Sequence, residues 1–513
     1  MLKGCLVAVA IGVFLALVPL VLIAVFYFEE DRRGAKEWEN AQAEVRAQGL
    51  TLDPAQSIPS PIPEADNLGN LALFGADEGT SNIVELSTLK AALQPVSSRL
   101  HFLTPEKEPK PDSLPFLPKW TEADPPDLKS ISARLKTILA LVDPGTPVKS
   151  HASCTELLDA LCPALAELRE ENKRRPDCLF VQHFEFKNPA KMSFGPTVGF
   201  LRLNEVLIYQ ERLALYENNP QLALANFEVA HKLILGLKKQ PFLLSGMVAM
   251  ALSEMQLVAV QEGLARHAWD DRSLVEIDAT LGKLDMLSLG RKWLIGDVVV
   301  FQVPAEKYYE QHRFVSLEKL SMLKGDIVTG APPPVQAERL TFWLTPKGWF
   351  DRDLAARVRI RLLELPRAFD PAKHQVHPEK LQSLLQSSAG RKSWVFWSVP
   401  LIEEQSWSLK SIRTLAYDQI HLDEARIACR LERYRLVHGD YPENLAALES
   451  SYGRNPRDVM TGEPYLYRRT KSGYLLYSVG WNQEDEGGEK VPAPPSVPSD
   501  APDWAWPRRL LAP

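Results

Sequence analysis

Three stretches near the carboxyl end decide the fold of this chain: Glu432-Arg-Tyr-Arg-Leu-Val-His-Gly-Asp-Tyr-Pro442, Thr461-Gly-Glu-Pro-Tyr-Leu-Tyr467 and Tyr477-Ser-Val-Gly-Trp-Asn-Gln-Glu-Asp-Glu-Gly-Gly488. They carry the densest ordered signals in the sequence, because a helix stop, turn residues, strand formers and acidic residues follow one another closely. Their order predicts a helix, a short second helix, a β-hairpin and an acidic loop.

The helix that leads into the first stretch is predicted from residue spacing. Apolar residues recur at intervals of a helical turn, at Ile420, Ile427, Leu431 and Tyr434, with charged residues between them. Gly439 favours the left-handed conformation that ends a helix, and Pro442 cannot continue the turn. Pro442 instead suits the start of a short helix that carries Leu445 and Leu448.

Beyond the two helices the pattern changes to that of β-strands. Residues 465–469 and 474–479 are rich in aromatic and β-branched strand formers. The segment Thr470–Gly473 joins them, and its length is typical of a β-hairpin loop. An acidic loop that closes on Gly487 and Gly488 follows the second strand.

The order of these elements resembles the soluble part of the type II secretion major pseudopilin. In that family a helix ending in a Tyr-Pro-x-x-Leu segment precedes a Pro-x-Asp-x-x-Gly-x-Pro-Tyr-x-Tyr turn, a hairpin and an acidic calcium loop. The matching positions here are Tyr441, Pro442, Leu445, Pro456, Asp458, Gly462, Pro464, Tyr465, Tyr467, Tyr477, Ser478 and Gly480. The resemblance covers residues 413–490, and it implies a small α+β pseudopilin-like module at 401–490.

The chain departs from that family in the position of its apolar segment. A pseudopilin begins with a cleavable leader and a membrane helix that runs directly into the module and carries a Glu near its start. Here the apolar segment lies far upstream of the module and contains no Glu. We therefore expect a pseudopilin-like module fused to a larger protein, in place of a subunit that joins a filament through its first helix.

Length and composition indicate a protein with several folded units. The chain has 513 residues, 45% of them hydrophobic and 24% charged, which is enough to bury cores in about two or three units. A formal net charge of −6 argues against a nucleic-acid partner, which requires a clustered basic surface. The 40 prolines gather in linker-like segments without a collagen period.

The apolar run at residues 5–28 predicts a transmembrane anchor within a unit 1–28. It is uncharged, and at about 1.5 Å per residue it can cross a bilayer core of about 30 Å. Residues 25–28 offer no small-residue cleavage site, which favours a retained anchor over a signal peptide. Basic residues nearly balance across the run, so its orientation rests on the resemblance. The resemblance implies an inner-membrane, single-pass protein with a cytoplasmic N-terminus and a periplasmic body.

The remaining chain divides into a neck, a helical region and a tail. The neck, 29–127, is expected to contain a juxtamembrane helix around Trp38 and proline-rich spacers at 57–63 and 104–126. The tail, 491–513, carries alternating Trp504 and Trp506, which we expect to dock on the preceding domain. The region 128–400 shows helical periodicity, at 130–141, 153–173, 199–218, 221–239, 241–266, 273–289, 304–323 and 352–365. The predicted fold is therefore mostly α, with a small C-terminal α+β module.

The acidic loop is the best candidate ligand site. Four residues crowd oxygen donors into five positions, at Asn482, Glu484, Asp485 and Glu486. Hard oxygen donors in a flexible loop suit Ca²⁺. The resemblance places the family's calcium loop here and implies Asn482 and Asp485 as ligands, with Asp503, beside Trp504, as a further ligand. The alternative is a solvated acidic turn without a metal.

The cysteines and the catalytic motifs indicate no other site. Cys154, Cys162 and Cys178 lack the Cys-x-x-Cys spacing of structural zinc sites, so we expect buried free thiols. A disulfide is the alternative in an extracytoplasmic body. The sequence has no His-Glu-x-x-His, Gly-x-Ser-x-Gly or phosphate-loop motif, and no catalytic residue is assigned. Glu432 and Arg435, one turn apart, are predicted to form a surface ion pair.

Together these features predict a membrane-anchored interaction or scaffold protein of the cell envelope. It would act alongside a secretion or pilus-like system and dock protein partners through helical grooves and the hairpin face. Two alternatives remain. One is an extracytoplasmic enzyme whose site is assembled from distant residues. The other is an atypical pseudopilin-like filament subunit.

Overall fold

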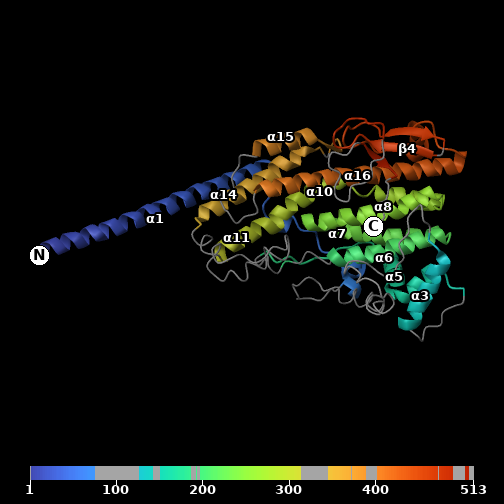
Figure 1. Ribbon diagram of the computed structural model, residues 1–513, viewed down its shortest axis with the longest axis horizontal. Coiled ribbons are helices and arrows are strands. Elements are labelled where there is room, and N and C mark those ends of the chain that lie inside the picture. The colour runs from blue at the N-terminus through green and yellow to red at the C-terminus, as the bar shows by residue number, and fades with distance from the viewer. Residues whose placement is uncertain are drawn as a thin grey trace.

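The computed structural model describes residues 2–74, 126–142, 151–186, 192, 197–312, 345–370, 372–388, 401–471, 473–488 and 503–507. These residues are mostly helical and include small antiparallel sheets, which confirms the predicted fold class at this level. Figure 1 shows one long helix projecting from an elongated helical body, with the strands beside the last long helix. The second proline-rich spacer and most of the tail lie outside the described residues.

The projecting helix is α1 (Leu2–Ala47), so the apolar run and the juxtamembrane helix around Trp38 are one continuous element. Beyond Phe28 one face of α1 is buried, at Glu30, Gly34, Ala41 and Val45. This face packs against α14 (Lys347–Val358). At about 1.5 Å per residue, α1 is about 69 Å long, which exceeds the thickness of a bilayer core.

The segment after α1 packs on the body, where the Leu68 N–H donates to the Asp177 carbonyl at 2.8 Å. It forms short 3₁₀ turns, η1 (Pro54–Gln56), η2 (Glu64–Asp66), η3 (Leu68–Asn70) and η4 (Ala72–Phe74). Residues 57–63, expected to be an extended spacer, lie on the body: the Ile62 N–H donates to Gln182 Oε1 at 3.0 Å, and Ile58 packs beside buried Phe242.

The first half of the helical region forms antiparallel layers of amphipathic helices. Its elements are α3 (Leu128–Val142), α4 (Cys154–Leu161), α5 (Pro163–Arg174), α6 (Thr197–Tyr216) and α7 (Pro220–Lys239). The helix predicted at 153–173 is divided, because Pro163 lacks the N–H needed to continue α4 and instead opens α5. Ser153 and Glu156 form a capping box that starts α4.

The second half surrounds a long apolar helix. Its elements are α8 (Leu243–Ala265), α9 (Asp271–Leu281), α10 (Met286–Gly296), the π-helical turn η7 (Asp297–Gln302) and α11 (Val303–His312). These are followed by α14, η9 (Arg359–Glu364), η10 (Leu365–Ala368), the paired strands β1 (Phe369–Asp370) and β2 (Gln375–Val376), and α15 (Pro378–Ser388). The helix predicted at 273–289 is divided because Asp285 caps a new helix, accepting from the Ser288 N–H.

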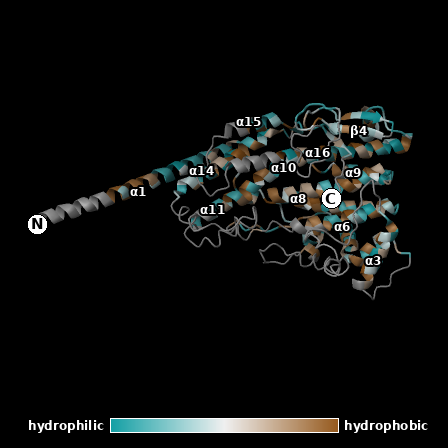
Figure 2. Ribbon diagram, in the orientation of Figure 1, coloured by the Kyte–Doolittle hydropathy of each residue, from teal (hydrophilic) through white to brown (hydrophobic). Residues whose placement is uncertain are grey.

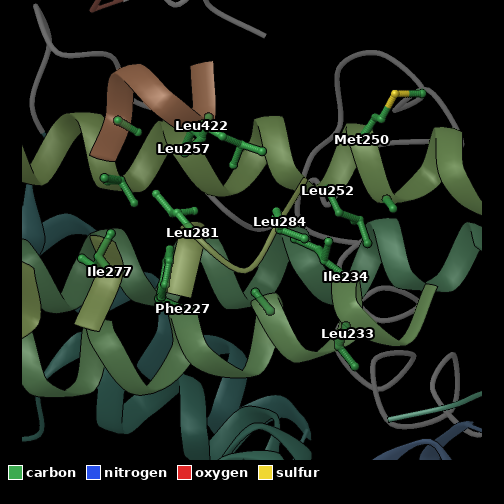
Figure 3. Packing of buried hydrophobic residues seen from close by; sticks show 14 of the residues in the cluster. Phe227, Leu233, Ile234, Met250, Leu252, Leu257, Ile277, Leu281, Leu284 and Leu422 are labelled. Carbon is green, nitrogen blue, oxygen red and sulfur yellow. The ribbon is translucent and has the colours of Figure 1, made fainter. Parts of the chain in front are cut away.

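Helix α8 is the centre of the core. Among the residues whose side chains the structure describes, which in α1 begin at Leu17, it is the one helix long and apolar enough to cross a membrane, and two thirds of its most apolar stretch is buried inside the body. Figure 3 shows Leu257 of α8 on the side of Leu281 of α9 and Phe227 of α7, and Leu252 of α8 beside Ile234 of α7. Trp293 of α10 lies so close to Gly246 of α8 that a Cβ there would overlap its indole ring.

The C-terminal elements follow the predicted order. They are α16 (Leu401–His438), α17 (Ala446–Tyr452), β3 (Leu466–Thr470), β4 (Gly473–Ser478) and β5 (Trp504–Trp506). β3 and β4 form the predicted hairpin, closed by the Thr470↔Gly473 pair. The tail tryptophans dock as expected: β5 adds to β4 as a third strand, and Trp504 and Trp506 are buried. One continuous hydrophobic cluster joins these elements to the helical region.

Candidate functional site

The acidic loop leaves the end of β4 and is closed by Asp503, which immediately precedes β5. The N–H groups of Glu486 and Gly488 both donate to Asp503 Oδ2, at 3.0 and 2.6 Å. Pairing of β5 with β4 places Asp503 against the loop. Asp503 is only 5% exposed, and among the described residues its second oxygen, Oδ1, has no hydrogen-bond partner. A buried carboxylate oxygen without a donor is costly unless a proton or a cation neutralises it.

The other two residues predicted as ligands lie on the same loop but differ in orientation. Asp485 Oδ1 accepts from the Tyr477 hydroxyl at 3.1 Å and from the Gly487 N–H at 2.9 Å. The Asn482 side chain donates its amide N–H to Glu486 Oε1 at 2.5 Å. The structure therefore brings Asp485, Glu486 and Asp503 around one turn, whereas Asn482 holds Glu486 and is not directed at Asp503.

The electrostatics of the loop are those of crowded carboxylates. Burial raises the pKa of Asp503 to about 6, and the neighbouring carboxylates of Glu486 and Asp485 raise it further. The hydrogen bond from the Gly488 N–H acts in the opposite direction and lowers it. Burial and the hydrogen bond to Asp485 raise the pKa of Tyr477 to about 12. The loop concentrates negative charge that no cationic side chain among its described contacts offsets.

The donor set fits a hard divalent cation in chemistry. Ca²⁺ takes oxygen ligands from carboxylates, amides and the backbone. Asp485, Glu486 and Asp503 would hold it, and Asn482 would join them after turning away from Glu486. Within the described residues no group of three or more His, Cys, Asp or Glu side chains has the arrangement of a formed metal centre. The loop is thus a candidate calcium site whose ligands would take up their positions only when the ion binds.

A second cluster lies where α8, α16 and the C-terminal elements meet. His421 Nδ1 lies 3.1 Å from Glu254 Oε1, and His421 Nε2 lies 4.0 Å from Glu424 Oε2. On the adjoining turn of α16, Asp423 Oδ2 accepts from the Tyr465 hydroxyl at 3.3 Å. Two charged residues of α16 are therefore buried, Glu424 on the apolar stripe and Asp423 beside it.

Burial determines the protonation of this cluster. Glu424 is fully buried, and the nearby carboxylates of Asp458, Asp423 and Glu254 add to that burial and raise its pKa well above the usual range. The Ser478 N–H opposes this slightly, yet neither Glu424 oxygen accepts a hydrogen bond of normal geometry from a described residue. Burial also raises the pKa of Asp423 to about 6. A neutral, protonated Glu424 is the state that this environment favours.

This cluster can hold a proton, but its geometry does not suit catalysis. His421 and Glu424 are almost fully buried, while Glu254 keeps a quarter of its side chain exposed. A substrate would therefore reach Glu254 before the other two groups. The sequence did contain a signal for this cluster, because Glu424 continues the Ile420, Ile427 and Leu431 stripe at helical spacing.

The predicted ion pair between Glu432 and Arg435 is present, but Glu432 is buried, so the prediction that the pair lies at the surface is wrong. Glu432 is 2% exposed and lies at the centre of a polar junction between α16, the residues after α8 and Tyr441. It accepts from Arg435 Nη2 at 2.7 Å and from the Tyr441 hydroxyl at 3.0 Å, and it lies 2.8 Å from His267 Nδ1. Burial opposes ionisation, but the donors Arg435 and His267 hold the pKa of Glu432 below its usual range.

The described cysteines are buried free thiols, as predicted: Cys154, Cys162, Cys178 and Cys429. Burial raises the pKa of the Cys154 and Cys162 thiols to about 12. A thiol with so high a pKa is a poor nucleophile and metal ligand at neutral pH, because the thiolate is the reactive form.

No protein-family model, no curated protein and no solved structure matches this chain.

Proposed function

We propose that this protein is a single-pass, membrane-anchored interaction or scaffold protein of the cell envelope. The observation that supports this most strongly is the apolar surface of α1. From Leu17 to Phe28 its large hydrophobic side chains are exposed, from 38% at Val18 to 71% at Phe28. Figure 2 shows this hydrophobic stretch giving way to a hydrophilic one where α1 reaches the body. So much apolar surface on an isolated helix favours a lipid environment.

The end of the apolar stretch is marked by charge. Glu29 pairs with Arg32 at 2.9 Å and with Arg33 at 2.8 Å, one turn beyond Phe28. Such a boundary suits the exit of a helix from the hydrocarbon core into water. We further propose the inner membrane and a periplasmic body, an orientation supported by the resemblance to a pseudopilin module.

The shape of the body and an apolar patch at its distal end support the proposed scaffold role. α16 extends along the body toward the end remote from α1 (Figure 1). There its last turn exposes two adjacent apolar residues, Leu436 at 46% and Val437 at 70%, close to the hairpin. We propose that a protein partner of the secretion or pilus-like machinery docks at this end. We also propose that Ca²⁺ orders the acidic loop, which lies farther back along α16, where Arg413 stacks on Trp481 and Tyr417 meets Trp504.

Membrane fractionation of the full-length chain tests the anchor. The variant Leu20→Arg with Ile23→Arg places two charges on the exposed apolar stretch, each costing about 2.5–3.5 kcal/mol near a bilayer centre. We expect it to leave the carbonate-resistant membrane fraction. The matched control Val437→Arg also adds a charge at an exposed apolar position, but on the body, and it should stay membrane-bound. Equal retention of both variants would refute the anchor.

A further inference from the structure

Helix α14 runs parallel to α1, and its first turn lies where the apolar stretch of α1 ends. The Gly348 N–H donates to Asp31 Oδ1 at 2.8 Å, and Arg359, just beyond α14, bonds Glu44 at 2.8 Å. Residue numbers therefore rise together along both helices, so the start of α14 faces the apolar stretch. Figure 1 shows the two helices together at the end of the body from which α1 projects.

The two helices cross in direct backbone contact. A Cβ on Gly34 would overlap the Gly348 backbone, and a Cβ on Gly348 would overlap the Glu30 carbonyl. Beside the crossing, Arg352 bonds Glu30 Oε2 at 2.9 Å and approaches Glu37 Oε1 to 3.3 Å. Glu30 and Arg352 are both buried. A close-packed crossing with a buried ion pair holds α1 and α14 as one rigid unit.

The first turn of α14 carries the residue types found at membrane surfaces. The Trp349 ring meets the Phe26 ring of the apolar stretch edge to face, with centroids 6.4 Å apart. Its indole N–H donates to Glu30 Oε2 at 2.8 Å, and the ring is half-buried. Lys347, two residues earlier, is exposed. Trp and Lys at the end of a membrane span lie at the headgroup level, where an apolar body and a polar tip are both satisfied.

We infer that the first turn of α14 lies in the headgroup layer of the bilayer that holds α1, so that the body sits rigidly on a phospholipid surface. This rests on the proposed anchor, because the depth of Trp349 is set by Phe26. A body tethered by a flexible neck would sample many distances from the membrane. Here residues 29–47 are fastened to the body, and the distance is fixed by the crossing of α1 and α14.

The test measures the depth of single labels in the full-length chain. Cys5 is replaced by Ala, and one cysteine is introduced at Leu22, Lys347 or Lys471 and labelled with NBD. The protein is reconstituted into phosphatidylcholine vesicles brominated either deep in the acyl chains or near the headgroups. We expect deep bromines to quench the label at 22 and shallow bromines to quench the label at 347. The label at 471, in the exposed hairpin loop, should keep its emission with both lipids.

The outcomes separate the two proposals. Quenching at 22 without quenching at 347 overturns the seated body and leaves the anchor in place. No quenching at 22 overturns the anchor and the inference with it. Adding Gly34→Leu, which forces the helices apart, should abolish quenching at 347 and preserve it at 22. Unchanged quenching at 347 in that variant would overturn the role of the crossing. The labelled proteins that keep Gly34 measure the depth of residue 347 without disturbing the fold.

Discussion

Asp503 offers the most discriminating test of the acidic loop, through the substitution Asp503→Asn. The side-chain carbonyl of Asn can still accept from the N–H groups of Glu486 and Gly488, as Oδ2 does now. Its amide N–H₂ would replace the unpartnered Oδ1 beside the carboxylate of Glu486. The substitution therefore removes the charge while preserving the shape and the hydrogen bonds of the loop.

The expected magnitude follows from the pKa of Asp503. In the folded chain it is raised from 3.8 to about 6, which at neutral pH corresponds to a ceiling of about 3 kcal/mol for the ionised form. Solvent screening at a surface loop lowers this to about 1–2 kcal/mol. Because the folded pKa is the higher one, the stabilising contribution of Asp503 is complete below pH 4 and is lost as pH rises through about 6.

Urea unfolding of the full-length chain in detergent, with a chelator present, measures this effect. At neutral pH Asp503→Asn should be more stable than the unsubstituted protein by about 1–2 kcal/mol, and at pH 4 the two should be equal. Excess Ca²⁺ should stabilise the unsubstituted protein and leave the variant unchanged. Glu484→Gln, an exposed substitution in the same loop, is the matched control. A variant that is less stable than the parent at neutral pH in chelator would refute the reasoning.

Three further substitutions test the buried carboxylate cluster, the hydrophobic core and the junction of α1 with α14. Glu424→Gln mimics the protonated acid, so the variant and the parent should be equally stable in urea at pH 4, below the unfolded pKa of 4.5. The variant should become increasingly more stable as the pH rises above 4.5, because the unfolded parent ionises while the folded parent stays protonated; parallel pH profiles would contradict this. Trp293→Ala empties a fully buried site and should cost about 3–5 kcal/mol in the same assay, whereas a loss below 1 kcal/mol would mean that the core is not packed as described. Glu30→Ala leaves buried Arg352 without its close partner and should cost about 3–5 kcal/mol, seen as faster hydrogen exchange in residues 29–47 of α1. Glu29 is half-exposed and pairs with Arg32 and Arg33 of α1, so it serves as the control. Glu29→Ala should leave that exchange unchanged, and equal effects of the two substitutions would contradict a buried junction.

Local structure was predictable wherever the sequence contains residues that end a helix or form a tight turn. Gly439 ends α16 with a left-handed residue, and the short loop between residues 470 and 473 sets the hairpin register. Helix boundaries were predicted wrongly where a residue that starts a new helix lies within a continuous pattern of apolar residues. Pro163 and Asp285 each start a new helix inside a stretch whose periodicity is continuous, because periodicity reports which face is buried and not whether the backbone is unbroken.

Long-range pairing explains what the sequence could not show. Charge predicts exposure at Glu432, but its partners His267 and Tyr441 come from separate elements and make burial possible. In the acidic loop, the resemblance implied Asn482, Asp485 and Asp503 as ligands, and composition placed Glu486 among the oxygen donors. The hydrogen bond from the Glu486 N–H to Asp503 joins residues on either side of the tail and could not be predicted from the loop alone. The crossing of α1 and α14 joins residues more than three hundred positions apart, as in the hydrogen bond from the Gly348 N–H to Asp31. No local sequence pattern specifies such a contact.

We propose above that α1 places its apolar stretch in a membrane with the whole body on one side. Single cysteines at Leu22 and Lys471, in the chain with Cys5→Ala, can be treated with a membrane-impermeant maleimide in intact cells whose outer membrane has been made permeable. We expect residue 471 to be labelled at once and residue 22 to be labelled only after detergent dissolves the membrane. Labelling of residue 22 in intact membranes would contradict it.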